Sequence, residues 1–583
     1  MTLLDMVHSP ADVKKMSVQQ LNDLAQEIRQ GILKRDSLIG GHVGPNLGFV
    51  EATLALHYVF NSPVDKIVFD VSHQCYAHKM ITGRYNGFFN PDDYDKITGY
   101  TNPHESEHDH FVIGHTSTSV SLASGLAKAR DLKGEKHNVI AVIGDGSLSG
   151  GEALEGLDFA ASELGSNFIV VVNDNQMSIA ENHGGLYNNL KLLRETNGQA
   201  EINFFEALGY DYIYVNDGND VEKLIAAFQS VKDTNKSVVV HLNTLKGKGY
   251  KLAETYKEPW HWSVPFDIES GDKTVDFGDG ESLDDLTYNY LNGKIKNGEN
   301  VAIVVAGTPG VFGLNEQRRQ ELGAHYIDVG IAEEHAVAMS SALAKGGCRP
   351  VFCVHSSFLQ RTYDQLSQDL ALNKNPAVIL VYWSGLSSAD ATHLGCFDMA
   401  MASNIPNITF LTPATKEEYM AMLDWAMTQN DGPVMIRVPN AVVYGAEVAP
   451  RADEVKALAF AQKGEKVALL AVGEMLGLAK QTAETLKNFN INVSLATVRC
   501  VSELDTAALE SLKNKHKVVI TLEGGVINGG FGEKIARYFG NSELKVLNYG
   551  AKKEFTDRLP LDVLYRENRL LPQMIAEDAL KLL

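Results

Sequence analysis

The sequence predicts an α/β protein whose mainly parallel, doubly wound sheets are divided among three domains. The chain has 583 residues, which is more than a single hydrophobic core usually contains. Short apolar runs of strand character alternate with segments of helical periodicity, as in 139–143, 150–164 and 168–172. The strand-like runs end in glycine and polar residues, which is typical of the ligand-binding edge of a parallel sheet.

Composition narrows the class of protein and its partners. Hydrophobic residues make up 44% of the chain and charged residues 21%, as in an ordinary globular protein. The net charge of -21 argues against nucleic acid or an anionic membrane as the main partner. The five cysteines show no metal-ligand spacing, and no signal-like or membrane-spanning apolar segment is evident. We therefore expect a cytoplasmic enzyme with small-molecule substrates.

Histidines occur in the glycine-rich and polar loops of the N-terminal region. The loop 40–48 contains His42, a predicted strand that ends at Val71 leads to His73, and a later loop contains His115. A single histidine in a loop is usually a surface or capping residue. Three that follow strands or precede helices of one α/β domain are expected to converge, because those ends share one edge of the sheet.

The most specific stretch is 143–179, a predicted strand–helix–strand unit. Asp145 lies in a Gly-Asp-Gly turn after the first strand, and Asn175 and Met177 follow the second strand about thirty residues later. Mg²⁺ prefers about six oxygen ligands and often keeps phosphate oxygens among them. A carboxylate, an amide oxygen and a main-chain carbonyl therefore suit a magnesium-bound diphosphate, which the glycines allow to approach the backbone. A nucleotide-binding turn or a plain βαβ unit remains the alternative for the Gly-Asp-Gly turn taken alone.

The remaining N-terminal elements include one basic turn. A helix is predicted over 12–34 and a strand over 237–242. Lys246 follows that strand beside glycines, where it forms either a solvated turn or a phosphate contact. Because the chain is so acidic, a phosphate contact is at least as well supported. His261 follows between two tryptophans.

Three domains are predicted, with boundaries at 1–300, 301–450 and 451–583. The first includes a linker over 267–300, which is rich in Gly, Asp, Glu and Asn. Glu333 lies at the start of a helix in the second domain. A carboxylate at that position normally complements the helix dipole and needs no further role.

Nine segments occur in a fixed order along nearly the whole chain: GGHVGPNLG, FDVSHQCYAHKMITGR, GHTSTS, GDGSLSGGEALEG, NDNQMSIAEN, TLKGKGY, IAEEHAV, SSFLQRTYDQ and ADATHLGCFD. Together they resemble the 1-deoxy-D-xylulose-5-phosphate synthase family, thiamine diphosphate (ThDP) enzymes of the transketolase superfamily. The resemblance implies a pyrophosphate-binding, a pyrimidine-binding and a transketolase-type C-terminal domain, in a homodimer. It also implies that pyruvate is decarboxylated and joined to glyceraldehyde 3-phosphate, which supplies precursors of isoprenoids, thiamine and pyridoxal.

The resemblance assigns cofactor roles to single residues. It implies that Mg²⁺ is bound by Asp145, Asn175 and Met177. The residues that it places on the ThDP diphosphate are His73, Ser117, Gly146, Ser147 and Lys246. Glu333 would hydrogen-bond to the aminopyrimidine nitrogen, while Ile179 would brace the bent cofactor and Phe358 would stack on its pyrimidine ring.

The resemblance also implies a reacting centre and an acceptor pocket. The residues lining the reacting centre as hydrogen-bond donors and proton carriers would be His42, His115, His261 and His393. Asp390 would hold the catalytic loop, and Arg361 and Arg437 would face substrate or acceptor phosphate.

Several positions depart from the family pattern. The long insertion usual after Leu186 is replaced by a short polar connection. His355 stands where the family usually has Tyr, and Trp383 stands where it usually has an Arg that contacts the acceptor phosphate. The loop between Asp390 and His393 is one residue shorter. The last three departures lie near the acceptor pocket. They do not affect the predicted use of ThDP, but they leave the identity of the acceptor undecided.

Two alternative functions follow. A transketolase-like ketol transferase with a different donor or acceptor is the alternative within enzymes. A catalytically silent binding protein with the ThDP fold belongs to another class, and the intact Asp145, Asn175 and Glu333 argue against it.

Overall fold

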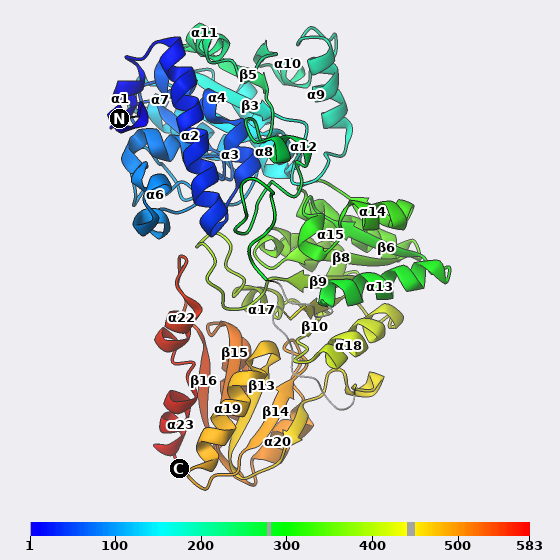
Figure 1. The fold of residues 1–583 in the computed structure, drawn as a ribbon. Helices are drawn as coiled ribbons and strands as arrows, with labels where there is room; N and C mark the ends of the chain where they lie inside the picture. The colour runs from blue at the N-terminus through cyan, green and yellow to red at the C-terminus, as the bar shows by residue number, and fades with distance from the viewer. Residues whose placement is uncertain (1, 277–281, 440–448) are drawn as a thin grey trace. The chain divides into compact units, whose positions relative to one another are not determined.

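The computed structural model describes residues 2–276, 282–439 and 449–583 (Figure 1). The chain divides into two compact units. The first comprises Met1–Asp279 with Gly330–Ala332, and the second comprises Gly280–Val329 with Glu333–Leu583. Both units are built on mainly parallel sheets, which confirms the predicted α/β class. The second unit holds two of the three sheets, and the division at 300 and 450 stays a prediction.

The first unit contains a five-stranded parallel sheet in the order β1-β2-β3-β5-β4. Its strands are β1 (Lys66–Phe69), β2 (Val139–Gly144), β3 (Phe168–Asp174), β4 (Asp211–Val215) and β5 (Ser237–Asn243). The β2–β3 pairing runs as far as Gly144 and Asn173. The turns that contain Asp145 and Asn175 therefore begin at the same edge of the sheet.

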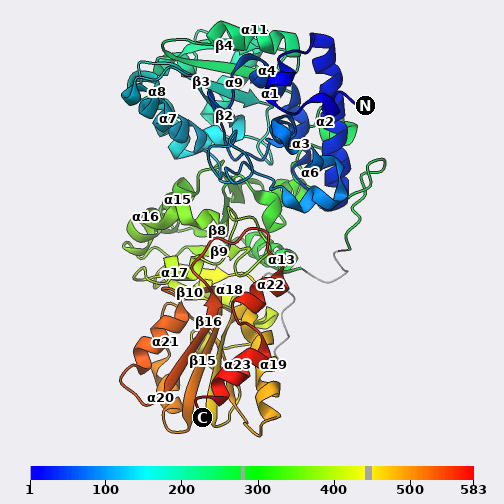
Figure 2. The ribbon, with the colours of Figure 1, turned by 90° about the vertical axis from the view of Figure 1, so that its left-hand side faces the viewer.

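Helices cover both faces of this sheet because its strands are apolar on both sides. Helices α4 (Val50–Val59) and α11 (Val221–Val231) pack on one face, and α7 (Ser119–Lys133) and α8 (Gly151–Ser162) pack on the other (Figure 2). Helix α10 (Phe204–Leu208) joins α7 and α8 in their core. The other helices of this unit are α1 (Pro10–Val13), α2 (Val18–Ile39), α3 (Val43–Gly48), α5 (Tyr76–Lys79), α6 (Asn86–Phe89), α9 (Gly185–Glu195) and α12 (Lys251–Thr255).

The second unit begins with a six-stranded parallel sheet in the order β10-β11-β9-β8-β6-β7. Its strands are β6 (Val301–Val305), β7 (Tyr326–Asp328), β8 (Arg349–His355), β9 (Val378–Tyr382), β10 (Thr409–Leu411) and β11 (Val434–Arg437). One face is covered by α13 (Leu283–Lys296), α14 (Glu316–Leu322) and α18 (Lys416–Thr428). The other is covered by α15 (Glu333–Lys345) and α17 (Asp398–Ala402), and α16 (Tyr363–Gln365) follows β8.

The third sheet has the order β12-β14-β13-β15-β16. Its strands are β12 (Ala459–Gln462), β13 (Lys466–Val472), β14 (Ser494–Val498), β15 (His516–Val526) and β16 (Lys545–Ala551), and only β12, at the edge, runs antiparallel. Helices α19 (Leu476–Lys487) and α23 (Pro572–Leu580) pack on one face (Figure 1), and α20 (Thr506–Leu512) and α21 (Phe531–Phe539) pack on the other. Helix α22 (Leu561–Glu567) follows β16.

Two sequence predictions of local structure differ from the observed elements. The first long helix runs over 18–39, not 12–34, because Ser17 and Gln20 form a reciprocal capping box that fixes its start. The prediction of a linker over 267–300 is wrong for residues 283–296, which form α13. This helix is capped by Ser282 and buries Tyr288 and Leu291 in the core of the second unit.

The end of β1 also differs from the prediction. The strand ends at Phe69, and Val71, which was expected inside it, has φ +56°. The chain therefore turns sharply two residues before His73. Within the described ranges, no helix combines the length and apolar character that a membrane span requires.

Candidate functional site

The Gly-Asp-Gly turn connects β2 to α8 and buries a carboxylate. Asp145 is 2% exposed, and its Oδ2 accepts a hydrogen bond from Asn182 Nδ2 at 2.8 Å. Burial raises the pKa of this carboxyl, and the nearby Asp174 raises it further. Asp174 has its own partners in Arg194 and His241. A buried carboxylate held by a neutral amide is a group that a cation would stabilise.

Asn175 and Met177 lie in the turn after β3. Within the part of the chain that the structure describes, the Oδ1 atoms of Asn175 and Asn182 are buried and lack a hydrogen-bond partner. Met177 forms an isolated bridge with Glu181. Buried oxygens without donors are uncommon, and together with the Asp145 carboxylate they suit a hard cation.

The oxygens that could bind a cation here belong to different chemical groups. Residues 2–276, 282–439 and 449–583 contain no group of three or more His, Cys, Asp or Glu side chains suited to a metal. The fit to Mg²⁺ therefore depends on one carboxylate, amide oxygens and main-chain carbonyls. An ion held this way keeps coordination positions for phosphate and water.

The loops around this turn pack so closely that glycine is required. A Cβ on Gly146 would lie 2.7 Å from Ser178 Oγ, and a Cβ on Gly150 would lie 2.1 Å from Ser117 Oγ. Ser117 Oγ donates a hydrogen bond to the carbonyl of Ser147 at 2.8 Å. The structure thus brings together three residues predicted to bind a diphosphate, namely Ser117, Gly146 and Ser147.

Three of the predicted site histidines, His42, His73 and His261, lie close together in the first unit, and the expected convergence of His115 with them stays a prediction. The ring centroids of His42 and His73 are 5.1 Å apart, those of His42 and His261 are 5.8 Å apart, and those of His73 and His261 are 5.2 Å apart. Lys246 Nζ lies 3.1 Å from His261 Nδ1 and donates to the carbonyl of Ser178 at 2.5 Å. The predicted Lys246 contact and these histidines therefore belong to one cluster, and the half-buried Ile179 follows Ser178.

Burial sets the protonation state of this cluster. It lowers the pKa of His73 to about 3 and that of Lys246 to about 7, and it holds the pKa of His261 well below its usual range. The imidazoles of His73 and His261 are therefore neutral near pH 7, so each of these two rings has one donor and one acceptor nitrogen. The buried Nδ1 of His73 has no hydrogen-bond partner within the described residues.

Asn46 connects the loops of this histidine cluster, although the sequence did not single it out. Its Nδ2 donates to the carbonyls of His42 and His73 at 2.7 and 2.6 Å, and its Oδ1 accepts from the N–H of Tyr76 at 2.9 Å. The side chain therefore fixes the two histidine loops relative to each other. Its position inside the GPNLG motif was the only signal in the sequence.

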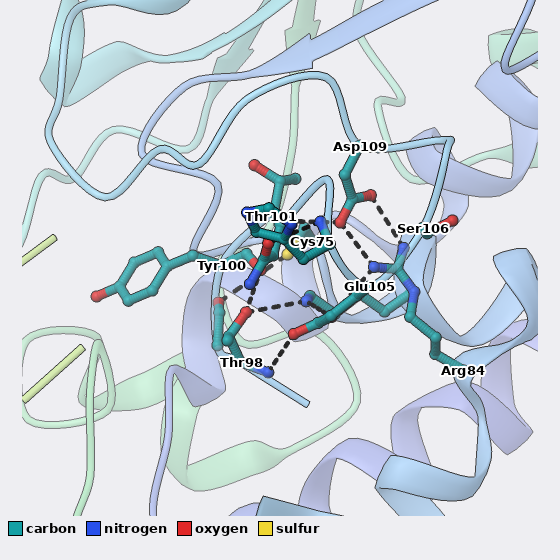
Figure 3. Close-up of polar contacts among 12 residues, drawn as sticks. Cys75, Arg84, Thr98, Tyr100, Thr101, Glu105, Ser106 and Asp109 are labelled. Carbon is teal, nitrogen blue, oxygen red and sulfur yellow. Dashed lines mark hydrogen bonds and ion pairs between the residues drawn. The ribbon is translucent and has the colours of Figure 1, made fainter. Parts of the chain in front are cut away.

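His115 lies at the end of a long connection that a buried ionic network holds in place. Arg84 donates to both carboxylate oxygens of Asp109 (Figure 3). Lys79 donates to Glu105 at 2.5 Å. In Figure 3 the ring of Tyr100 points away from these ion pairs, and its centroid is 5.8 Å from that of His42. His115 itself is half-buried.

The second unit contains the remaining predicted residues. Glu333 begins α15 and is 2% exposed, and its Oε2 lies 3.4 Å from Arg361. Burial raises the pKa of this carboxyl, although Arg361 lowers it in part. Glu333 therefore holds its proton to a higher pH than an exposed glutamate.

Four rings gather at the carboxyl ends of β8 and β9. The ring of His355 lies 4.9 Å from Phe358, 6.3 Å from Trp383 and 6.3 Å from His393, and Phe358 lies 5.7 Å from His393. Trp383 has φ +54° and is 58% exposed. These predicted residues are therefore neighbours, and the largest of them faces open space.

Arg437 and Asp390 both have ionic partners. Arg437 is 3% exposed, and it donates to Asp398 at 2.9 Å and to Glu474 at 3.0 Å. Its guanidinium is already neutralised by two carboxylates, which favours a structural role over the predicted phosphate contact. Asp390 lies 3.7 Å from Arg558.

Comparison with known families decides which enzymes this chain is related to. The family model for 1-deoxy-D-xylulose-5-phosphate synthase matches residues 4–203 and 193–244. Models for the transketolase pyrimidine-binding and C-terminal domains match 290–444 and 456–573. A 1-deoxy-D-xylulose-5-phosphate synthase of Caldanaerobacter subterraneus subsp. tengcongensis is 38% identical and covers 99% of each chain. One from Clostridium tetani is 37% identical over 100% of this chain and 99% of its own.

The chain belongs to the 1-deoxy-D-xylulose-5-phosphate synthase family. Membership confirms the predicted enzyme class and the predicted reaction, the condensation of pyruvate with D-glyceraldehyde 3-phosphate to 1-deoxy-D-xylulose 5-phosphate and CO₂, over the alternative ketol transfer. It also implies thiamine diphosphate as the cofactor. Among solved structures, a transketolase from Leishmania mexicana is 15% identical with a TM-score of 0.45, over 97% of each chain.

Proposed function

We propose that the first unit binds the diphosphate of ThDP through Mg²⁺. The ligands would be Asp145, Asn175 and the carbonyl of Met177. The diphosphate would contact His73, Ser117, Gly146, Ser147 and Lys246. The observation that carries this proposal is the buried Oδ1 of Asn175, which lacks a hydrogen-bond partner within the described residues. Its turn begins at the same edge of the sheet as the turn with the buried Asp145 carboxyl, whose pKa is raised.

The second unit would supply the proton chemistry. Bound ThDP provides the electron sink for the decarboxylation of pyruvate. Glu333, whose pKa is raised by burial, would hold a proton against the aminopyrimidine ring. Ile179 and Phe358 would orient the cofactor, and Asp390 would hold the loop that carries His393. Neutral rings in the histidine cluster, together with His115 and His393, would donate hydrogen bonds to the reacting groups.

The acceptor would meet the ring cluster of the second unit. His355 and His393 are basic rings of this cluster, and Trp383 offers an exposed apolar face. Arg361, which is paired with Glu333, would face the acceptor phosphate. Because Arg437 is paired with Asp398 and Glu474, it would act by holding this region together. The exposure of Trp383 favours a second candidate at this point, a synthase that accepts aldehydes other than glyceraldehyde 3-phosphate.

The proposal extends to the oligomeric state and the cellular compartment of the enzyme. The active form would be a homodimer in the cytoplasm that feeds isoprenoid, thiamine and pyridoxal synthesis. Light scattering of the purified protein tests the dimer. A monomeric mass in an active preparation would contradict it.

Two measurements test the proposed cofactor and reaction. Titration calorimetry of the metal-free protein with ThDP should show binding with Mg²⁺ and none with a chelator. Release of CO₂ from pyruvate should then depend on bound ThDP and rise when glyceraldehyde 3-phosphate is added. Equal ThDP affinity with and without Mg²⁺ would refute the metal ligands.

A further inference from the structure

Strand β1 has a buried carboxylate at each end. Asp65 precedes the strand and Asp70 follows it, and the two residues are 4% and 1% exposed. Asp65 accepts hydrogen bonds from the main-chain N–H and the side-chain amide of Asn138 at 2.7 and 3.0 Å. Asp70 accepts from the N–H groups of Ser117 and Ser119 at 2.8 and 2.9 Å. Similar bonding therefore occurs at opposite edges of the sheet.

Asp70 differs from Asp65 in what it connects. It begins the segment that leads to His73, and it holds the loop that contains Ser117. Ser117 extends the connection to a third loop, because its Oγ donates to the carbonyl of Ser147. Each of these three loops carries a residue proposed to bind the diphosphate of ThDP.

The backbone around Asp70 is strained. Val71, Ser72 and Ser117 have φ values of +56°, +66° and +74°, in the left-handed region that residues other than glycine avoid. Such a conformation costs free energy and persists only where its surroundings hold it. The Asp70 carboxylate provides that constraint for Ser117, since it fixes the N–H groups on both sides of the turn.

We propose that Asp70 is a positioning residue for the ThDP diphosphate. Its carboxylate holds the 115–119 loop in the left-handed conformation that presents Ser117, and through it Ser147, to the cofactor. Asp70 acts through these residues and does not touch ThDP. This inference rests on the proposed cofactor site in the first unit.

Two matched substitutions, Asp70→Asn and Asp65→Asn, test the proposal. In each variant, one carboxylate oxygen, which accepts hydrogen bonds, is replaced by an amide NH₂ group, which donates them. For each variant, calorimetry gives the Kd of the metal-free, full-length protein for ThDP with Mg²⁺, and a thermal scan gives its Tm. We expect both variants to lower Tm, and only Asp70→Asn to raise Kd, by about tenfold to a hundredfold for the loss of one bond to a charged group. Saturating ThDP should restore most of kcat.

A third variant, Asp70→Glu, covers the case in which Asp70→Asn fails to fold. It keeps the negative charge but moves the carboxylate by one methylene, and we expect a raised Kd here as well. An unchanged Kd in the Asp70 variants, or an equal rise in Asp65→Asn, would overturn the positioning role. Failure of the wild-type protein to bind ThDP would instead refute the proposed cofactor site, before any variant is compared.

Discussion

The proposed cofactor residues of the first unit and the proposed acceptor residues of the second unit are held by different forces. Asp145 and Ser117 are buried, and directional hydrogen bonds link their loops. The rings of His355 and Trp383 are stacked with their centroids 6.3 Å apart, and Trp383 is 58% exposed. Buried polar networks lose much when one partner is removed, whereas ring contacts at a surface tolerate rearrangement. The first group should therefore be intolerant of substitution and the second adjustable.

The largest effect is expected from Asp145→Ala. ThDP–Mg²⁺ binding should be abolished, because a diphosphate cannot be held at a buried site without the ion that neutralises it. Titration calorimetry measures the loss, and Asp158→Ala, an exposed position on α8, is the matched control. Unchanged affinity in Asp145→Ala would remove this residue from the metal site.

Glu333→Ala should leave the fold intact and lower turnover by about 10²–10⁴-fold, the usual contribution of a positioned acid or base. The neighbouring Glu334→Ala is the control, since Glu334 is half-buried on the same helix. Hydrogen–deuterium exchange at the thiazolium carbon of bound ThDP is the direct measurement. A wild-type exchange rate in Glu333→Ala would show that the carboxyl has another role.

Trp383→Arg should change acceptor preference and leave ThDP affinity unchanged. An Arg contact to phosphate contributes roughly 1.5–3 kcal/mol, so the KM for glyceraldehyde 3-phosphate should fall by about tenfold to a hundredfold. The KM for unphosphorylated glyceraldehyde should not fall. Phe489→Arg, at another exposed aromatic residue, controls for added charge. If wild type already binds the phosphorylated acceptor tightly and Trp383→Arg gains nothing, Trp383 does not set acceptor choice.

Glu333→Gln should have the smallest effect of these variants, and this effect should appear in the pH dependence of the free energy of unfolding. Burial raises the folded-state pKa of Glu333 above its ordinary value of 4.5, so the folded chain binds more protons than the unfolded chain between the two values. Wild-type stability should therefore fall as pH rises above 4.5, by about 1.4 kcal/mol per unit of pKa difference, and level off above the folded-state pKa. Denaturant unfolding from pH 4 to 8 should show a shallower decline for Glu333→Gln than for the wild type, because other buried carboxyls with raised pKa values, such as Glu523, still contribute in both proteins. Parallel curves for the two proteins would contradict it.

Local pattern was enough to predict most of the strands and helices and to single out the Gly-Asp-Gly turn. The glycines around Asp145 and the apolar runs on either side identify a strand–turn–helix wherever they occur. Asn46 and Asp70 were missed because their partners are main-chain groups of loops as much as 49 residues away, and no residue pattern records such contacts.

The errors have similar causes. Helix α13 was taken as a linker because it buries few apolar residues along a polar stretch. The ionic partners of Arg437 were not foreseen because one of them, Glu474, follows 37 residues later and belongs to another predicted domain, and the phosphate contact of Arg437 stays a prediction. Partner identity across such separations depends on packing, which the sequence alone does not show.

The Oδ1 atoms of Asn175 and Asn182, which lack hydrogen-bond partners among the described residues, have a consequence for the lifetime of the protein in the cell. Each buried polar atom without a partner costs about 1–3 kcal/mol, which a bound metal and cofactor would recover. A ligand that binds only the folded chain stabilises it in proportion to the logarithm of its concentration over Kd. Newly made chains that lack cofactor should therefore unfold more often and be degraded sooner than loaded ones. Enzyme abundance would then follow the supply of ThDP without any change in gene expression.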